Sequence, residues 1–473
     1  MKILLVKKDK CAIIAERGNI MAIGKKYEID MTTGPILKKM IAFAFPLMCS
    51  SILQLLFNAA DTIVVGKFAG DNSLAAVGSN GSLINLMTNL FIGLSIGTNV
   101  LIGKSVGAND KEHTEKLVHT SMAVSVIGGV FLMLFGITFA ERILILMDSP
   151  AEVLPLATQY LKIYFIGLPA MMIYNFGSAV LRAVGDTKRP LYYLTVAGVI
   201  NVIFNLLFVI RFKMDVAGVA WATVISQIVS ALFIITCLIK QDSYIRLRPG
   251  NLKIDPDSLK RIIRIGIPAG IQGCLFSFSN VIIQSSINSF GATVVAGSSA
   301  AQNIEGFTYV SMNAFHQATL TFTSQNVGAG RFDRVGKILA RGLICVTITG
   351  ITIGYLEILF GHQLLGIYSN DFSVIEKGFE RLLIMSGTHF LCGFMDVLVG
   401  SIRGLGYSVL PMIVSLIGAC GLRILYIKTL FRMEMFHSTK YIYITYPISW
   451  LMTIIAHVIC YMIIRQKIMK ERA

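Results

Sequence analysis

The 473-residue sequence has few charged residues: Asp, Glu, Lys and Arg together make up 14% of it, whereas an ordinary globular domain has about 25%. Hydrophobic residues make up 55%, and the mean hydropathy is +0.70. A chain with so few polar residues cannot form the polar surface that a protein dissolved in water needs. The composition therefore excludes an ordinary soluble domain and favours a protein that lies in a membrane.

The sequence also lacks the patterns of disulfide frameworks, metal sites and soluble enzymes. None of the eight cysteines forms a C-x-x-C pair, and seven lie inside apolar segments, so we interpret them as small core residues. There is no H-E-x-x-H motif and no soluble catalytic domain. We therefore predict that the protein is not an enzyme and has no cofactor.

What the sequence does contain is an internal repeat. Val106-Gly107-Ala108 recurs as Val327-Gly328-Ala329, and Leu181-Arg182-Ala183-Val184-Gly185 recurs as Ile402-Arg403-Gly404-Leu405-Gly406. Both recurrences have the same offset along the chain, whereas chance matches would scatter over many offsets. The chain is therefore interpreted as a tandem duplication.

Each copy contains six apolar stretches of a length that can cross the roughly 30 Å hydrocarbon core of a bilayer as a helix. The twelve predicted spans are residues 36–66, 74–103, 117–140, 157–182, 190–210, 218–240, 262–287, 293–324, 337–361, 378–403, 411–430 and 442–466. Because six is even, the second copy enters the membrane from the same side as the first. The predicted fold is an all-α membrane protein of twelve transmembrane helices in two six-helix bundles, related by an internal parallel repeat.

The bundles and their flanking segments divide the chain into five parts. We expect a cytoplasmic N-terminal extension at 1–32, an N-terminal bundle at 33–240, a cytoplasmic linker at 241–259, a C-terminal bundle at 260–466 and a cytoplasmic tail at 467–473. Met31 directly precedes the first span, and we expect translation to start there, which would leave most of the extension untranslated.

Lys and Arg are distributed unevenly between the two sides of this arrangement. With the N-terminus inside, the predicted inner segments hold 31 of the 42 basic residues. Basic residues favour the cytoplasmic side, so we expect a multi-pass protein of the plasma (inner) membrane with both termini in the cytoplasm. The formal charge of +16 is then explained by topology and contact with lipid, and we expect no nucleic-acid partner.

Few ionisable residues lie inside the predicted spans, where each costs roughly 2.5–3.5 kcal/mol unless it faces a polar cavity or a partner. The acidic ones that we single out are Asp61, Glu305 and Asp396. The alternative for Asp61 is a position near the membrane surface with a salt bridge to Lys67.

Amide side chains extend this polar pattern. Asn201 and Asn205 are four residues apart and share one face of a helix. Asp396 occupies in the second copy the position that Asn175 holds in the first, so the same depth is polar in both copies. This recurrence favours a functional role over simple packing.

Several stretches resemble, in order, the landmarks of the multidrug and toxic compound extrusion (MATE) transporters. These are Pro46 followed by Asp61-Thr62-x-x-Val65-Gly66, then Gly103-Lys104-x-x-Gly107-Ala108, Leu181-Arg182-Ala183-x-Gly185-Asp186-Thr187, and Gln325-Asn326-x-Gly328-Ala329-Gly330. The resemblance covers about residues 33–465. It implies an antiporter that exports small organic, often cationic, compounds in exchange for H⁺ or Na⁺ by alternating access.

The resemblance also implies a cation site in the N-terminal bundle. The matching positions that would form it are Asp61, Asn175, Asn201, Asn205 and Thr223, and Asp61 would be the ligand of Na⁺ if that ion binds. It implies that Pro46 lets the first helix bend. Asn205 stands where some members have a second carboxylate, which weakens Na⁺ coordination and leaves Asp61 as the main titrating group.

Substrate contacts are less evident from the sequence. We expect Glu305 and Asp396 to attract a cationic compound in the C-terminal bundle, and Met172, Tyr174 and Phe307 to contribute to an adaptable apolar wall.

Two other functions stay open, and we expect a monomer in every case. A flippase of lipid-linked sugars would have the same architecture, but its pyrophosphate ligand would need Arg and Lys, which are scarce in the predicted central helices. The other alternative is a membrane enzyme or a channel.

Overall fold

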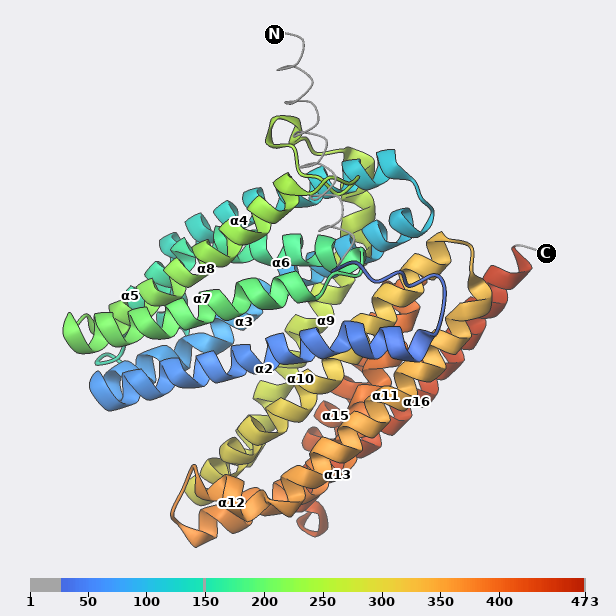
Figure 1. The fold of residues 1–473 in the computed structure, drawn as a ribbon. Coiled ribbons are helices and arrows are strands. Elements are labelled where there is room, and N and C mark those ends of the chain that lie inside the picture. The colour runs from blue at the N-terminus through green and yellow to red at the C-terminus, as the bar shows by residue number, and fades with distance from the viewer. Residues whose placement is uncertain (1–26, 148–149, 472–473) are drawn as a thin grey trace, which may run out of the picture.

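The computed structural model describes residues 27–147 and 150–471, and these residues form long helices with no strand among them (Figure 1). The first helices are α2 (Ile36–Phe68), α3 (Asp71–Gly107), α4 (Lys111–Leu146), α5 (Leu154–Ile166), α6 (Leu168–Ala183), α7 (Lys188–Leu206) with a π-helical end (Leu207–Arg211), and α8 (Asp215–Lys240). A short 3₁₀ helix (Pro249–Asn251) lies in the linker.

The second set consists of α9 (Pro256–Asn288), α10 (Ala292–Gly328), α11 (Phe332–Leu359), α12 (Gly361–Gly366), α13 (Phe372–Gly404), α14 (Val409–Ser415), a π-helical segment (Leu416–Gly421), α15 (Leu422–Lys428), two 3₁₀ turns (Leu430–Arg432 and Glu434–Phe436) and α16 (Thr439–Lys470). Most of the predicted N-terminal extension and the last two residues of the predicted tail lie outside the described residues.

Ten of the described helices are long and apolar enough to cross a membrane, and the bent pair α5–α6 makes an eleventh span. The two halves of that span meet at 47°, next to Pro169 in the first turn of α6. The twelfth span is α10, which has 37 residues but many Ser, Thr and Asn side chains. Most of those in its second half are buried, and α10 packs against α13, α11, α3 and α2, whereas Thr293, Ser299 and Asn303 in its first half are exposed. The predicted twelve-helix membrane fold is therefore confirmed.

The duplication is visible in the backbone. Gly70 and Gly291 precede α3 and α10 with φ of 91° and 92°, and Gly185 and Gly406 follow α6 and α13 with φ of 92° and 101°. Each pair has the offset of the sequence repeat. Only glycine adopts such angles without strain, so the repeat has kept the same two turns in both copies.

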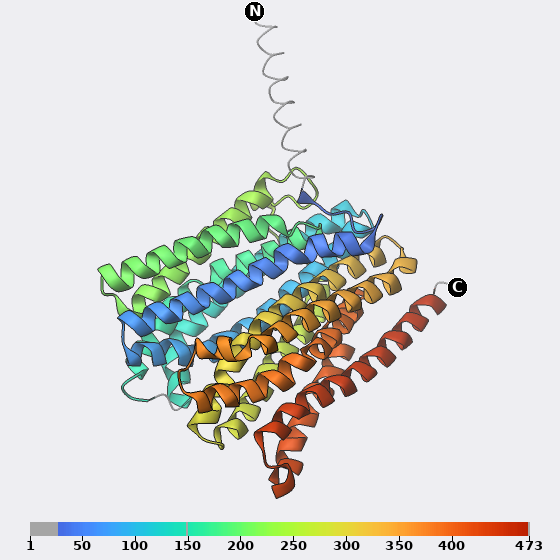
Figure 2. The ribbon, with the colours of Figure 1, turned by 60° about the horizontal axis from the view of Figure 1, so that its bottom comes forward.

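The two sets of helices meet through α3, which packs along α9 and α10, and through α2, which also contacts α10. Figure 1 and Figure 2 show them as two neighbouring blocks. A Cβ atom on Gly93 would lie 2.2 Å from the backbone nitrogen of Gly270, so glycine is required for this approach of α3 to α9. Residues 93–97 have the G-x-S-x-G spacing of hydrolases, but they lie in the middle of a helix and not at a strand-to-helix turn, so they serve packing.

The blocks are closest at the end where the described chain begins and finishes, which we call the terminal end (Figure 1). There a Cβ on Gly107 would lie 2.0 Å from the carbonyl oxygen of Gln325, and a Cβ on Gly328 would lie 1.9 Å from that of Lys104. Lys104 Nζ also donates to the carbonyl oxygen of Leu405 at 2.9 Å. Two glycines at equivalent positions of the repeat thus close this end by backbone contact.

Candidate functional site

A chain of polar side chains joins α2, α7 and α8. Asn205 donates hydrogen bonds from Nδ2 to Asp61 and, at 3.4 Å, to Oδ1 of Asn201. Asn201 in turn donates from Nδ2 to Oγ1 of Thr223, also at 3.4 Å. The structure therefore brings together four of the five predicted cation-site residues, from three helices.

The helical register explains this arrangement. Asn201 and Asn205 are one turn apart on α7, and both are buried. Thr223 is fixed by donating its hydroxyl to the carbonyl oxygen of Val219 on α8. Asp61 comes from α2, which packs along α7 and remains helical through Pro46.

Asp61 has aromatic and amide neighbours but no cationic one. Its side chain is half-buried, and the stacked rings of Tyr160 and Tyr164 lie within electrostatic range of its carboxylate. Within the described residues 27–147 and 150–471, no Lys or Arg forms an ion pair with Asp61, and Lys67 is exposed. The alternative of an Asp61–Lys67 salt bridge is thus not what the structure shows.

The polar chain has one carboxylate. Its other oxygen atoms belong to amides and a hydroxyl, and Oδ1 of Asn205 is buried without a hydrogen-bond partner. In the described part of the chain, no three His, Cys, Asp or Glu residues group as metal ligands. Such a site can take a proton or one monovalent cation, and it does not have the ligands of a typical transition-metal site.

The other predicted residues of the N-terminal half lie elsewhere. Asn175 donates from Nδ2 to the carbonyl oxygen of Met171 at 3.0 Å, within its own helix. Tyr174 donates its hydroxyl to the carbonyl oxygen of Pro190 at 3.1 Å. Met172 is completely buried in the hydrophobic core. In this conformation Tyr174 and Met172 therefore contribute to contacts between helices, Asn175 bonds only within α6, and none of the three joins the polar chain of Asp61.

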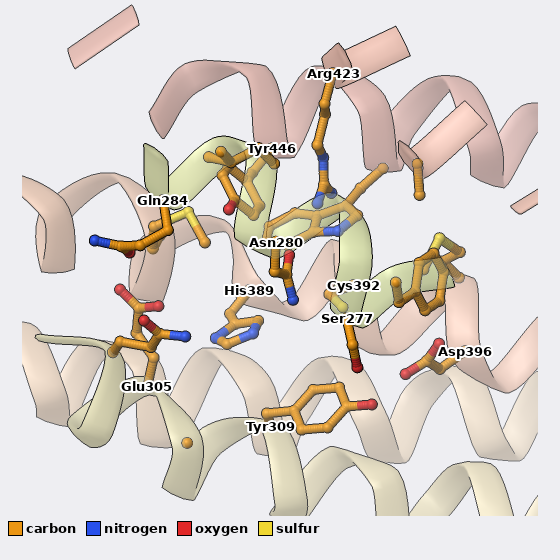
Figure 3. A pocket seen from close by; sticks show the side chains of 18 of the residues that line it. Ser277, Asn280, Gln284, Glu305, Tyr309, His389, Cys392, Asp396, Arg423 and Tyr446 are labelled. Atoms are coloured by element: carbon orange, nitrogen blue, oxygen red, sulfur yellow. The ribbon is translucent and has the colours of Figure 1, made fainter. Parts of the chain in front are cut away.

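The C-terminal half contains a cavity of about 450 Å³ between α9, α10, α13, α15 and α16, with one contribution from α3 (Figure 3). This volume lies within the roughly 300–1,000 Å³ range of small-molecule sites. Glu305 and Asp396 both line it, as expected. The side chain of Phe307 does not, although its neighbour Gly306 does.

Glu305 is not free to attract a cation. Arg381 Nε donates to Oε1 of Glu305 at 2.8 Å, and its Nη2 donates to Oε2 at 2.9 Å. Both side chains are about 5% exposed, so this is a buried two-point ion pair. The expectation that Glu305 offers its charge to a substrate is therefore wrong for this conformation, because Arg381 neutralises it.

Asp396 differs from Glu305. Its carboxylate lines the cavity and has no hydrogen bond from any described residue, although its backbone oxygen is bonded to Nδ1 of His316 at 2.6 Å. Arg403 acts on this carboxylate only through its charge, because its Nη2 donates to Oε1 of Gln272 at 2.8 Å. Asp396 is thus the one acidic side chain of the described cavity wall that is not paired.

Several buried charged residues were missed by the sequence reasoning. Arg381, Arg403 and Arg423 are 4–6% exposed and lie within helices of the C-terminal half. Glu357 of α11 is also buried and accepts hydrogen bonds from Thr308 and Ser386. The statement that Arg is scarce in the central helices is therefore wrong. The signal was available, because all three arginines lie in predicted spans, but their partners are distant in the sequence.

Comparison with known proteins agrees with this architecture. The sequence model of the MatE family matches residues 46–207 and 268–427, once in each copy of the repeat. The chain is 27% identical to "Probable multidrug resistance protein YoeA" of Bacillus subtilis over 82% of its length and 85% of that protein. It is 26% identical to "Probable multidrug resistance protein NorM" of Thermotoga maritima, over 81% and 83% of the two chains.

A solved structure described as the outward-facing conformation of a multidrug resistance MATE family transporter superposes with a TM-score of 0.84 at 22% identity. The superposition covers 93% of this chain and 97% of that one, and it shows the shared fold. The family match covers more than half of the chain and occurs twice, at the spacing of the internal repeat. The chain therefore belongs to the MatE family of multidrug and toxic compound extrusion transporters.

Proposed function

We propose that the protein is an antiporter that exports small organic compounds from the cytoplasm in exchange for a cation, by alternating access in the plasma membrane. The substrate class follows the relatives named as multidrug resistance proteins. The observation that carries the proposal is Asp61, a carboxylate in a membrane-spanning helix that is held by Asn205 and has no cationic partner in the described structure.

Neutralisation of Asp61 offers a physical route to coupling. A hydrogen bond from an amide to an ionised carboxylate is roughly twice as strong as one to a neutral group, so protonation of Asp61 weakens the contact between α2 and α7. The other half of α2 is anchored elsewhere: Met40, Phe43 and Ala44 pack in the same hydrophobic cluster as Phe322 of α10. Therefore α2 connects the cation site with the interface between the two blocks of helices.

A proton is the coupling ion that we favour, with Na⁺ as the alternative. The polar chain supplies one carboxylate, and Asn205 contributes an amide at the position where the family resemblance implies a second carboxylate in some members. A proton needs only the carboxylate, whereas Na⁺ needs several oxygen ligands at once.

We further propose that the terminal end faces the cytoplasm and that the protein acts as a monomer. Among the described residues, the predicted inner segments hold most of the Lys and Arg residues and lie at this end. Contacts of Gly107 and Gly328 close the same end, so the conformation described here corresponds to the state that faces outward.

Reconstitution into lipid vesicles tests the coupling. The purified protein should drive dye efflux under an imposed pH gradient, and Asp61→Asn should abolish it while dye binding in detergent persists. Thr62→Ala, which alters an exposed neighbour on the same helix, is the matched control and should transport normally. Efflux by Asp61→Asn at the wild-type rate would refute the assignment, and efflux under a Na⁺ gradient alone would replace the proton by Na⁺.

The buried arginines favour one alternative, a flippase of lipids with anionic head groups. Arg381 and Arg423 both line the cavity, and such residues suit phosphate groups. The same vesicles distinguish the two functions, because a flippase would move a fluorescent anionic lipid between leaflets without an ion gradient. A membrane enzyme or a channel would instead show turnover of the dye or uncoupled conductance.

A further inference from the structure

Arg423 is the cation of the described cavity wall that has no carboxylate partner. It extends from α15 towards the middle of the cavity (Figure 3), and its side chain is 6% exposed. Its Nε donates to Oγ of Ser449 at 2.7 Å, whereas Nη2 is buried with no hydrogen-bond partner. The other arginine of the wall, Arg381, already has its charge balanced by Glu305.

A buried guanidinium without an anion is costly, and aromatic rings compensate only part of that cost. The Cζ atom of Arg423 lies 4.0 Å from the ring centroid of Tyr446 and 5.5 Å from that of Trp450. These stacked rings hold the guanidinium in place while leaving hydrogen-bond donors unused. Such an arrangement suits a planar anionic group, which an arginine binds through parallel hydrogen bonds.

The wall next to Arg423 is aromatic. Trp450 stacks on His389 with 5.6 Å between ring centroids and 8° between planes, and His389 stacks on Tyr309 at 6.4 Å and 24°. All three side chains line the cavity. A flat hydrophobic ring can lie against this row, whereas the acyl chains of a lipid would gain nothing from its planarity.

We propose that the cavity of the C-terminal half binds an aromatic compound that carries a carboxylate or a similar anionic group, with the anion on Arg423 and the ring beside His389 and Tyr309. An amine on the same compound would face the unpaired carboxylate of Asp396. The ligand is a transported substrate only if the proposed export function holds, so this assignment rests on that function. It changes the expected preference from simple cations to aromatic acids and zwitterions.

Equilibrium binding in detergent tests the assignment without any ion gradient, so failure of antiport and failure of this site are distinguishable. The probes are 7-(diethylamino)coumarin-3-carboxylate and its neutral 3-carboxamide, which share one ring system. We expect the wild type to bind the carboxylate at least about tenfold more tightly, as a charge-assisted hydrogen bond allows. Equal affinities for the two probes would overturn the proposal.

Variants locate the preference on one side chain. Arg423→Met should remove the preference for the carboxylate while retaining carboxamide affinity, and Arg423→Lys should retain part of the preference. Arg341→Met is the control, because Arg341 of α11 is an exposed arginine of the same half that does not line the cavity. The role of Arg423 would be refuted if Arg423→Met kept the preference for the carboxylate. It would also be refuted if Arg341→Met lost as much of the preference as Arg423→Met.

Competition separates an aromatic substrate from a lipid. Solubilised phosphatidylglycerol should not displace the coumarin carboxylate more effectively than phosphatidylcholine does. Selective displacement by phosphatidylglycerol would assign Arg423 to a lipid phosphate and overturn the aromatic substrate class. If Arg423→Met fails to fold, the probe pair on the wild type and Arg423→Lys still decides the outcome.

Discussion

Replacement of Gly328 by alanine should open the terminal end. The new Cβ would lie 1.9 Å from the carbonyl oxygen of Lys104, compared with about 3.4 Å for ordinary contact, so α10 and α3 must separate by about 1.5 Å. Overpacking of this kind costs about 1–3 kcal/mol. This cost applies only to the conformation in which the two helices touch. The equilibrium ratio of molecules with a closed terminal end to molecules with an open one should therefore fall about 5- to 150-fold.

Distances between spin labels measure this shift directly. Glu112 and Asp333 are exposed in the first turns of α4 and α11 and occupy equivalent positions of the repeat in the two halves. In a cysteine-free background with labels at both positions, Gly328→Ala should move the main distance population to longer values. Gly107→Ala should do the same, because its Cβ would meet Gln325 at 2.0 Å.

The control is Gly78→Ala, a glycine of α3 around which a Cβ would meet no atom within 4 Å. It should leave the distances unchanged. If Gly328→Ala gave the same distance distribution as Gly78→Ala in stable, monodisperse protein, the closing role of this contact would be refuted.

Three further outcomes follow from contacts of single residues. Asn205→Ala should slow gradient-driven efflux while retaining substrate binding, because Asp61 loses its hydrogen-bond donor; unchanged efflux in vesicles would contradict this. Arg381→Met should lower stability by about 3–5 kcal/mol, since it leaves Glu305 buried without a partner, and adding Glu305→Gln should restore most of the loss in a thermal unfolding assay. Asp30 precedes α2: burial raises its pKa, but hydrogen bonds from Thr33 and Thr32 and the charge of Lys39 lower it further, so the net pKa lies below the usual 3.8. The ionised form therefore stabilises the start of α2 above about pH 4, and this contribution is lost as the pH falls further. The hydrogen-exchange protection factors of residues 27–36, corrected for the intrinsic pH dependence of amide exchange, should be lower at pH 3 than at pH 6 in the wild type and show no such change in Asp30→Asn.

The sequence was sufficient for the fold because hydrophobic length and an internal repeat are local or one-dimensional signals. The break between α5 and α6 was not predicted, since hydropathy runs smoothly through Gly167 and only the following Pro169 marks it. α10 was predicted as a span although its composition is polar, and its burial explains why this polarity is tolerated.

Site residues were predictable where they lie one helical turn apart, and less so where partners come from distant helices. The spacing of Asn201 and Asn205 indicated a common face, and the family resemblance supplied Asp61. In contrast, Glu305 and Arg381 are 76 residues apart, and nothing local to either position indicates that they neutralise each other. The role of Arg423 depends on the absence of a similar partner among its described neighbours, which only a three-dimensional arrangement reveals.

The polar character of α10 has a consequence for how the protein is made. Alone, this helix is less apolar than the other spans, and it packs against α2 and α3, which are synthesised earlier, and against α11 and α13, which are synthesised later. Stable insertion of α10 therefore depends in part on helices that have not yet left the ribosome when it emerges. A chain truncated after residue 330 should leave this segment poorly anchored and open to proteolysis, whereas one truncated after residue 406 should protect it.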